Sequence, residues 1–184
     1  SRHLDLILSA VNQGNTGASV ELPGGIKAAV QYNQLNIMKL KGETKDIFCH
    51  NLIVPGITEI KEIGGLIEAE IIEGNLPDYS AADKFTRYFD YDRIKENLIA
   101  RSRRDGDFMV PLGMKGKKKI KDIFIDSKVP REERDSIPLV SCDGEVIWIV
   151  GYRISDNYKI TQNTKKVLKL QYKDNKDNKG EQRC

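Results

Sequence analysis

The sequence has little of the chemistry on which most active sites depend. Histidine occurs only as His3 and His50, and the three cysteines are Cys49, Cys142 and Cys184. The cysteines are scattered and lack a C-x-x-C pair, which argues against a disulfide framework and against a zinc site. His50 follows Cys49 directly, but neighbours on a strand point to opposite faces, so we expect no catalytic dyad there. The sequence therefore predicts no metal site and no nucleophile–base pair.

Long apolar runs are also missing. The longest run, residues 146–150, is far shorter than the roughly 20 apolar residues that cross a bilayer. No charged segment followed by an apolar stretch opens the sequence in the manner of a signal peptide. Unpaired cysteines are typical of a reducing compartment. We therefore expect a cytoplasmic protein without a membrane partner.

Nucleotide-binding and hydrolytic motifs are absent. A P-loop reads G-x-x-x-x-G-K-[ST], yet the Gly-Lys pair at 116–117 has Pro111 in the first glycine position and Lys118 after it. Neither the Ser-Gly-Gly-x-Asp-Ser loop of ATP pyrophosphatases nor a G-x-S-x-G elbow occurs. Asp105 and Asp107 flank a glycine, which is typical of a turn that holds neighbouring basic side chains. We expect no catalytic residue and no bound cofactor in this chain.

Positive charge, in contrast, is concentrated in one segment. Residues 101–134 contain 11 Lys and Arg against 6 Asp and Glu, whereas the whole chain has a formal net charge of +3. A basic patch attracts a polyanion through its local field even where the net charge is small. Segment 101–134 is therefore the candidate site.

Hydrophobic periodicity indicates a small first region. Apolar residues recur at helical spacing from Leu4 to Val11, and short strands are predicted at 19–22, 26–31 and 34–38. We therefore expect residues 1–45 to form a connecting segment made of one helix and a β-meander.

The second region, residues 46–172, alternates between short strands and turns. Strands are predicted at 47–54, 58–63, 66–72, 84–89, 97–102, 139–142, 145–151 and 167–172, and helices at 117–128 and 130–134. Many short strands with few helices, in no regular βαβ order, indicate an α+β fold. Residues 173–184 are almost wholly polar and are expected to form a disordered tail.

The basic segment offers side chains that suit phosphate. Arginines at 101, 103 and 104 cluster at a predicted turn, and their planar guanidinium groups fit bidentate phosphate contacts. The lysines at 117, 118 and 119 fall on the first turn of the predicted helix, where a bound anion would relieve their repulsion. The segment's only aromatics are Phe108 and Phe124, which favours phosphate and shape recognition over base recognition.

Two other interpretations of the charges remain open. A run of lysines is commonly just a solvated face of the protein. Arg101 and Arg134 could instead serve the fold by pairing with Asp105, Asp107 or Glu132.

Several motifs in this region resemble the C-terminal domain of the tRNA(Ile)-lysidine synthases. The resemblance rests on the run from Arg101 to Asp107, Pro111-x-Gly113, Lys118-Lys119-x-Lys121-x-x-Phe124, and Pro130-x-x-x-Arg134-x-x-x-Pro138. It covers residues 47–172. It implies a layered α/β sandwich similar to a domain of the phenylalanyl-tRNA synthetase β-subunit.

The resemblance also implies a function. Enzymes of this family are ligases that join lysine to C2 of the wobble cytidine in the CAU anticodon of an isoleucine tRNA. They use ATP and Mg²⁺ in an N-terminal domain, which we expect this chain to lack. The implied role of the present chain is to hold the tRNA body and acceptor stem without catalysing. That role is carried to ten basic residues: Arg101, Arg103, Arg104, Lys115, Lys117, Lys118, Lys119, Lys121, Arg131 and Arg134.

Two alternative functions stay open. The chain could be a free-standing RNA-binding module, or it could mainly mediate dimerisation through the apolar face of the Leu4–Val11 helix. A homodimer is compatible with the family resemblance as well.

Overall fold

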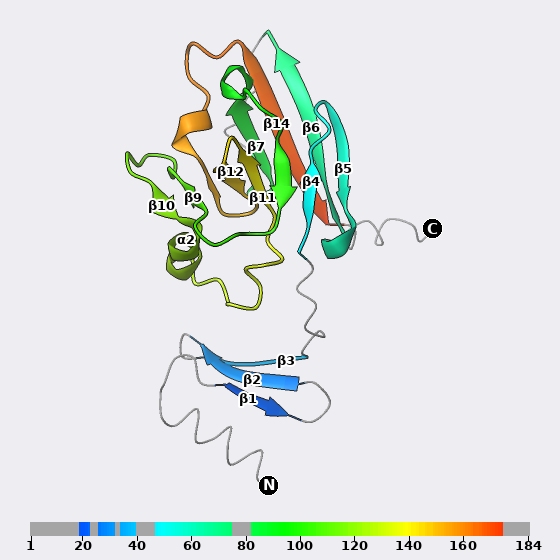
Figure 1. Cartoon of the computed structure of the whole chain (residues 1–184), viewed down its shortest axis with the longest axis vertical. Helices are drawn as coiled ribbons and strands as arrows, with labels where there is room; N and C mark the ends of the chain where they lie inside the picture. The colour runs from blue at the N-terminus through cyan, green and yellow to red at the C-terminus, as the bar shows by residue number, and fades with distance from the viewer. Residues whose placement is uncertain (1–18, 23–25, 32–33, 40–46, 75–81, 175–184) are drawn as a thin grey trace. The chain divides into compact units, whose positions relative to one another are not determined.

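The computed structural model describes residues 19–22, 26–31, 34–39, 47–74 and 82–174, and the chain divides into two compact units, Ser1–Lys45 and Asp46–Cys184 (Figure 1). The first unit contains an antiparallel sheet in the order β1-β2-β3, which confirms the predicted meander. Its strands are β1 (Ser19–Leu22), β2 (Ile26–Gln31) and β3 (Gln34–Lys39). The helix predicted between Leu4 and Val11 lies outside the described residues.

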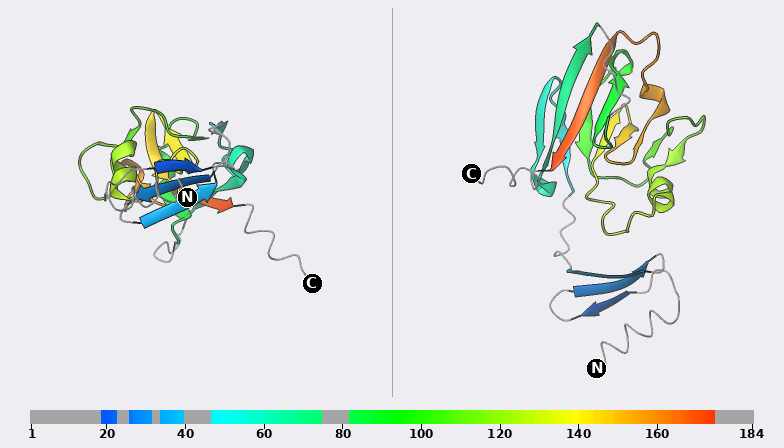
Figure 2. Two further views of the ribbon diagram at one scale, coloured as in Figure 1. Left: turned by 90° about the horizontal axis from the view of Figure 1, so that it is seen from below. Right: turned by 180° about the vertical axis from the view of Figure 1, so that it is seen from behind.

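The second unit is built on two antiparallel sheets (Figures 1 and 2). The five-stranded sheet has the order β13 (Arg153–Ile154), β12 (Glu145–Ile149), β11 (Leu139–Cys142), β8 (Ile99–Arg101) and β4 (Cys49–Asn51). The four-stranded sheet has the order β5 (Gly56–Ile60), β6 (Gly65–Glu73), β14 (Lys166–Asp174) and β7 (Thr86–Asp90). Three 3₁₀ turns join strands: η1 (Lys61–Ile63), η2 (Tyr91–Arg93) and η3 (Asp156–Tyr158).

The two sheets enclose the main hydrophobic core. Phe89 of β7 and Trp148 of β12 are both fully buried, and their ring centroids are 6.3 Å apart. The pairing of β11 with β12 shifts at Val140/Ser141, and this bulge lets Ile147 join Trp148 in the same core. Apolar burial of this kind is the main force that stabilises the domain.

The other face of the five-stranded sheet carries a smaller core beneath a single helix, α2 (Ile120–Asp126). Ile120, Ile123 and Phe124 of α2 are buried with Leu139 and Ile149 of the sheet. Strand β12 is therefore covered on both faces, which explains its continuous apolar sequence. A two-stranded ladder of β9 (Phe108–Met109) and β10 (Lys118–Lys119) leads into the helix.

The expected layered architecture is confirmed in part, since two sheets enclose the main core and a helix covers the other face of one of them. The described residues are, however, mostly β-sheet, with one seven-residue helix. The predicted helix 117–128 begins only at Ile120, since Lys118 and Lys119 pair with Met109 and Phe108. The predicted helix 130–134 is a turn instead.

The predicted boundary of the C-terminal tail is also wrong by two residues. Strand β14 runs through Lys173 and Asp174, because its pairing with β6 continues to Gly65. The remaining predicted strands lie within a few residues of observed ones, and 139–142 agrees with β11. None of the helices among the described residues is long and apolar enough to cross a membrane.

Two isoleucines on β5 provide a matched test of this core. Ile60 is fully buried, whereas Ile57 is 54% exposed. We expect Ile60→Ala to lower the free energy of unfolding by about 2–5 kcal/mol because it leaves a cavity. Ile57→Ala should change it by roughly 0.5 kcal/mol or less. Urea unfolding followed by tryptophan fluorescence measures both, and equal losses would contradict the assigned core.

Candidate nucleic-acid interface

A buried ion pair fixes the start of the basic segment. Arg101 is only 5% exposed, and its Nη1 and Nη2 donate to Oδ2 and Oδ1 of Asp107 at 2.7 and 2.8 Å. Arg101 also donates from Nε to the Ser141 hydroxyl at 3.3 Å and from Nη1 to the Ser102 carbonyl at 3.1 Å. Three groups thus share one guanidinium, and bidentate geometry of this kind gives strong, directional bonds.

Asp107 also organises the turn after β8. Its Oδ2 accepts the backbone N–H of Arg104 at 2.7 Å, which closes residues 104–107 into the predicted turn. Its carbonyl oxygen accepts the N–H of Ile120 at 2.9 Å and so holds the first residue of α2. The Arg101–Asp107 pair therefore connects the central sheet to the start of α2.

Two more arginines are engaged with the protein. Arg103 Nε lies 2.6 Å from Asp135 Oδ1, and both side chains are about one-fifth exposed. Arg134 donates from Nε and Nη2 to the Val129 carbonyl at 2.9 and 2.8 Å. The first contact holds loop 127–138 against the turn after β8, and the second joins two residues within that loop. Arg101, Arg103 and Arg134 are thus brought into the fold, as the alternative interpretation of Arg101 and Arg134 anticipated, although the partner of Arg134 is a carbonyl.

The lysines next to the helix differ from one another. Lys118 forms an ion pair with Asp126, and Lys117 Nζ lies 4.3 Å above the ring of Phe108. Lys119 is the residue before the helix, in extended conformation, and its side chain is exposed. The prediction that Lys117, Lys118 and Lys119 lie on the first turn of the helix is wrong, because all three precede Ile120. The seven-residue helix therefore does not form the predicted anion site at its N-terminus.

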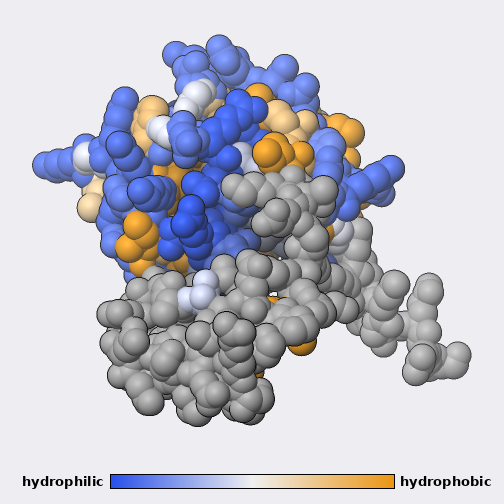
Figure 3. Space-filling view, turned by 60° about the horizontal axis from the view of Figure 1, so that its bottom comes forward, coloured by the Kyte–Doolittle hydropathy of each residue, from blue (hydrophilic) through white to orange (hydrophobic). Residues whose placement is uncertain are grey.

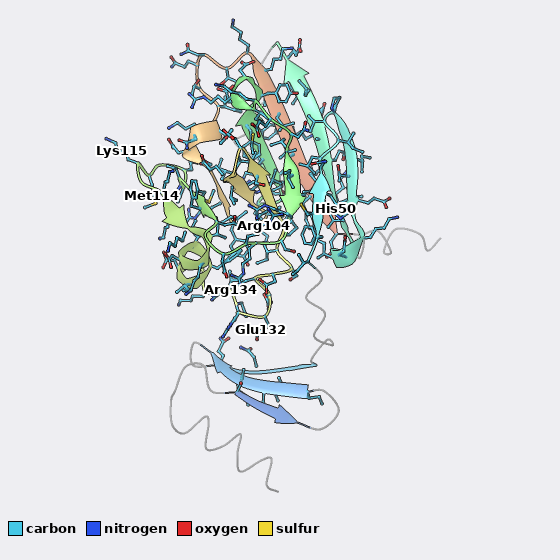
Figure 4. All side chains as sticks on the ribbon, viewed as in Figure 1. His50, Arg104, Met114, Lys115, Glu132 and Arg134 are labelled. Atoms are coloured by element: carbon cyan, nitrogen blue, oxygen red, sulfur yellow. The ribbon has the colours of Figure 1, made fainter. Side chains whose placement is uncertain are left out.

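Four basic residues are exposed and form no ion pair within the described part of the chain: Lys115, Lys119, Lys121 and Arg131. Arg104 is exposed too, with one weak contact to the Cys49 sulfur at 3.5 Å. In the view of Figure 4, Lys115 lies at the tip of one loop and Arg134 lies low on another, with β10 and α2 between them. We call Lys115, Lys119, Lys121 and Arg131 the basic surface.

The loop that carries Lys115 is held by a segment the sequence analysis missed. Asp156 Oδ1 accepts the N–H of Gly113 at 2.9 Å and the same carboxylate pairs with Lys159 at 2.9 Å. The Gly113 hydrogen bond and then Lys159 hold the pKa of Asp156 below its usual value. The N–H of Leu112 donates to the Ile154 carbonyl at 3.0 Å. The only sequence signal for this clamp is the turn-forming run Ser155-Asp156-Asn157.

The described part of the face drawn in Figure 3 is largely hydrophilic, with separate small apolar areas. Other lysines of the domain are used differently. On β14, Lys166, Lys169 and Lys173 pair across the strands with Glu73, Glu70 and Glu68. Positive charge there is neutralised by the sheet itself.

The residues considered for catalysis do not converge. Cys49 and His50 share strand β4, and His50 Nε2 lies 3.0 Å from the Glu62 carboxylate rather than from the thiol. No cluster of three or more metal-binding side chains occurs among the residues that the structure describes.

Comparison with known proteins places these observations in context. Residues 98–172 match the family described as the TilS substrate C-terminal domain. The tRNA(Ile)-lysidine synthase of Caldanaerobacter subterraneus subsp. tengcongensis is 42% identical over 170 residues, which are 92% of this chain and 36% of that protein. The enzyme of that name from Clostridium tetani is 38% identical over 96% of this chain and 38% of its own length. The chain therefore spans little more than a third of these relatives.

A solved structure from the same group of proteins is also similar to this chain. The crystal structure of a TILS C-terminal domain is similar with a TM-score of 0.61 and 32% identity, over 70% of this chain and 97% of that one. A phenylalanyl-tRNA synthetase β-subunit fragment from Pyrococcus horikoshii aligns with a TM-score of only 0.46 and 21% identity. The expected likeness to that synthetase domain therefore stays a prediction.

The two carboxylates of the 104–107 turn give a matched test of the buried pair. Asp107→Asn removes the charge that neutralises Arg101, whereas Asp105→Asn alters an exposed side chain of the same turn. We expect Asp107→Asn to cost about 3–5 kcal/mol of unfolding free energy, because an unpaired buried guanidinium remains. Asp105→Asn should cost about 0.5 kcal/mol or less. Chemical denaturation at neutral pH compares them, and a mild effect at Asp107 would refute the structural role.

The lowered pKa of Asp156 predicts a pH-dependent loop. Because the pKa of Asp156 is lower in the folded protein, the ionised carboxylate stabilises the folded loop fully at pH values above the unfolded pKa. This stabilisation is lost as the pH falls through the folded pKa. We expect the Gly113 amide to lose its protection from hydrogen exchange in that acid window. In Asp156→Asn this transition should vanish. An unchanged acid transition in the variant would contradict the assignment.

Proposed function

The chain belongs to the tRNA(Ile)-lysidine synthase family, and from this premise we propose that it forms a part of such an enzyme that holds the tRNA body and acceptor stem. The observation that carries the proposal is the basic surface beside α2. Ionised side chains without protein partners are free to replace the counterions of a phosphate backbone. We infer no catalytic residue in this chain.

The contacts of each basic residue reduce the number of the ten predicted residues that we propose to bind RNA. The guanidinium of Arg101 is buried and donates to Asp107, Ser141 and Ser102, so we leave it out of the RNA contacts. Arg103, Arg134 and Lys118 act first as supports of the loops around the helix. We propose that phosphate contacts come mainly from the basic surface, joined by Lys117 and Arg104 at its border.

The parent enzyme's reaction follows from the same premise as a proposal. It would join lysine to C2 of the wobble cytidine in an isoleucine tRNA with a CAU anticodon, in the cytoplasm, using ATP and Mg²⁺ bound outside this chain. The candidate site offers this reaction only electrostatic positioning, since exposed ammonium groups hold phosphates but do not read bases. A homodimer of the parent protein remains a further proposal.

A salt titration of tRNA binding tests the proposal. With about four phosphates neutralised, log K should fall with log salt with a slope of about −3 to −4. Replacing Lys119, Lys121 and Arg131 by Gln should reduce that slope by about 3 and abolish most binding at physiological salt, because each lost phosphate contact contributes about 1. Fluorescence anisotropy with labelled tRNA at four salt concentrations gives the slopes.

The ladder on β14 supplies the matched control for this experiment. Lys166 and Lys169 are also surface cations, but each is paired with a glutamate. Their replacement by Gln in a double variant should leave affinity and slope unchanged. A loss of affinity per removed charge equal to that of the triple variant would mean that net charge alone governs binding, and the assignment of the surface would be wrong.

A further inference from the structure

A cavity of about 590 Å³ lies in the two-sheet domain, and none of the basic-surface residues lines it. Four segments line it: residues 83–85 before β7, 136–138 before β11, 150–152 after β12, and 172–174 at the end of β14. Its volume falls within the roughly 300–1,000 Å³ of small-molecule sites. Nothing in the proposed phosphate contacts uses it.

Aromatic rings from separate segments meet in this cavity. Phe85 and Tyr152 remain 38% and 37% exposed, although both are large and apolar. The ring of Tyr172 lies 6.1 Å from that of Phe85, and Phe124 of α2 supports Tyr152 edge-on at 6.0 Å. Rings that are supported from behind yet exposed to solvent are suited to stacking with another flat group.

The backbone fixes the position of these rings. The N–H of Tyr172 donates to the Phe85 carbonyl at 2.9 Å, which attaches the Phe85 segment to β14. Gly151 has φ +81°, and a Cβ there would lie 3.3 Å from Cε1 of Phe85. A glycine thus satisfies the turn and leaves the phenyl ring in place.

The charges at the cavity are balanced. Lys84 Nζ lies 4.9 Å from the centroid of the Phe85 ring, and Lys173 is paired with Glu68. Asp83 and Asp174 line the same cavity. Two cations and two anions do not favour a phosphate, whereas they suit a flat, neutral group that has both hydrogen-bond donors and acceptors. A nucleobase has these properties.

The cavity is continuous with the segments that carry the basic surface. Residues 136–138 follow the loop that contains Arg131, and Tyr152 touches Phe124, which lies on α2 three residues after Lys121. An RNA strand held by its phosphates on Lys121 and Arg131 would therefore have an unstacked base within reach of this cavity.

We propose that the Phe85–Tyr152 cavity binds an unpaired nucleobase of the RNA held by the basic surface. The inference rests on the proposed RNA-binding function, and it adds a subsite that recognises a base rather than the backbone. Stacking on one aromatic side chain contributes about 1–3 kcal/mol, so the subsite should change affinity at least about fivefold.

A direct test uses NMR of the full chain with labelled aromatic side chains. A single-stranded trinucleotide should shift the Phe85 and Tyr152 ring signals upfield, and an abasic trinucleotide of the same charge should not. Equal shifts with the abasic analogue, or none with either, would overturn the proposal. Ring signals that change when residues 175–184 are removed, without RNA, would show instead that the chain's own end occupies the cavity.

A variant separates the base subsite from the phosphate surface. Phe85→Leu keeps an apolar side chain but removes the stacking ring, and should weaken tRNA binding at least about fivefold with an unchanged salt slope. The blunt duplex of the acceptor stem, which has no unpaired base, should bind both forms equally. Ile57→Ala, at an exposed apolar residue on β5, is the control and should bind tRNA normally.

The outcomes distinguish the two proposals. Steep salt dependence with no effect of Phe85→Leu on either RNA would leave the basic surface intact and refute the subsite. Base-dependent ring shifts in a chain that fails to bind tRNA would refute the basic surface and keep the nucleobase site.

Discussion

The ion pair between Arg101 and Asp107 is the contact on which the candidate interface depends. A buried pair stabilises only when its remaining hydrogen-bonding groups are satisfied. Here the guanidinium also donates to the Ser141 hydroxyl and the Ser102 carbonyl, and the carboxylate also accepts the backbone N–H of Arg104. The same aspartate holds Ile120 at the start of α2 through its carbonyl. One strongly bonded pair therefore lies between the end of β8 and the start of α2 and holds both in place.

This arrangement separates the two kinds of cation. The guanidinium groups of Arg101, Arg103 and Arg134 turn toward the protein, where their planar donors reach two carboxylates and a carbonyl. The exposed positions are left mainly to lysines. An ammonium group is a hydrated point charge on a flexible stem, whereas a guanidinium holds its donors in a fixed fork. The arginines therefore hold the segment in its conformation, and the lysines supply most of its exposed positive charge.

The parts of the fold that local patterns control could be predicted. Local hydrophobic patterns predicted β11 and the three strands of the first unit with nearly correct ends. The predictions were wrong where residues far apart in the sequence determine the secondary structure. Lys118 and Lys119 look helical by sequence but pair with Met109 and Phe108. The hydrogen bond from Gly113 to Asp156 and the contact of Phe85 with Tyr172, 87 positions away, could not be predicted, because the partner in each case is chosen by the finished fold.

Because its exposed cations are mainly lysines, the basic surface can contribute little to selectivity in the proposed RNA binding. Lysines on a surface attract any phosphate backbone, so they raise affinity and association rate for all RNAs of suitable shape. Arg101 cannot offer the bidentate contact by which arginine often reads guanine, because Asp107 accepts from both of its Nη atoms. Discrimination between RNAs must then come from groups that contact bases or from shape. On the proposed function, the exposed rings of Phe85 and Tyr152 are described groups that can contact bases, as are the exposed guanidinium groups of Arg104 and Arg131.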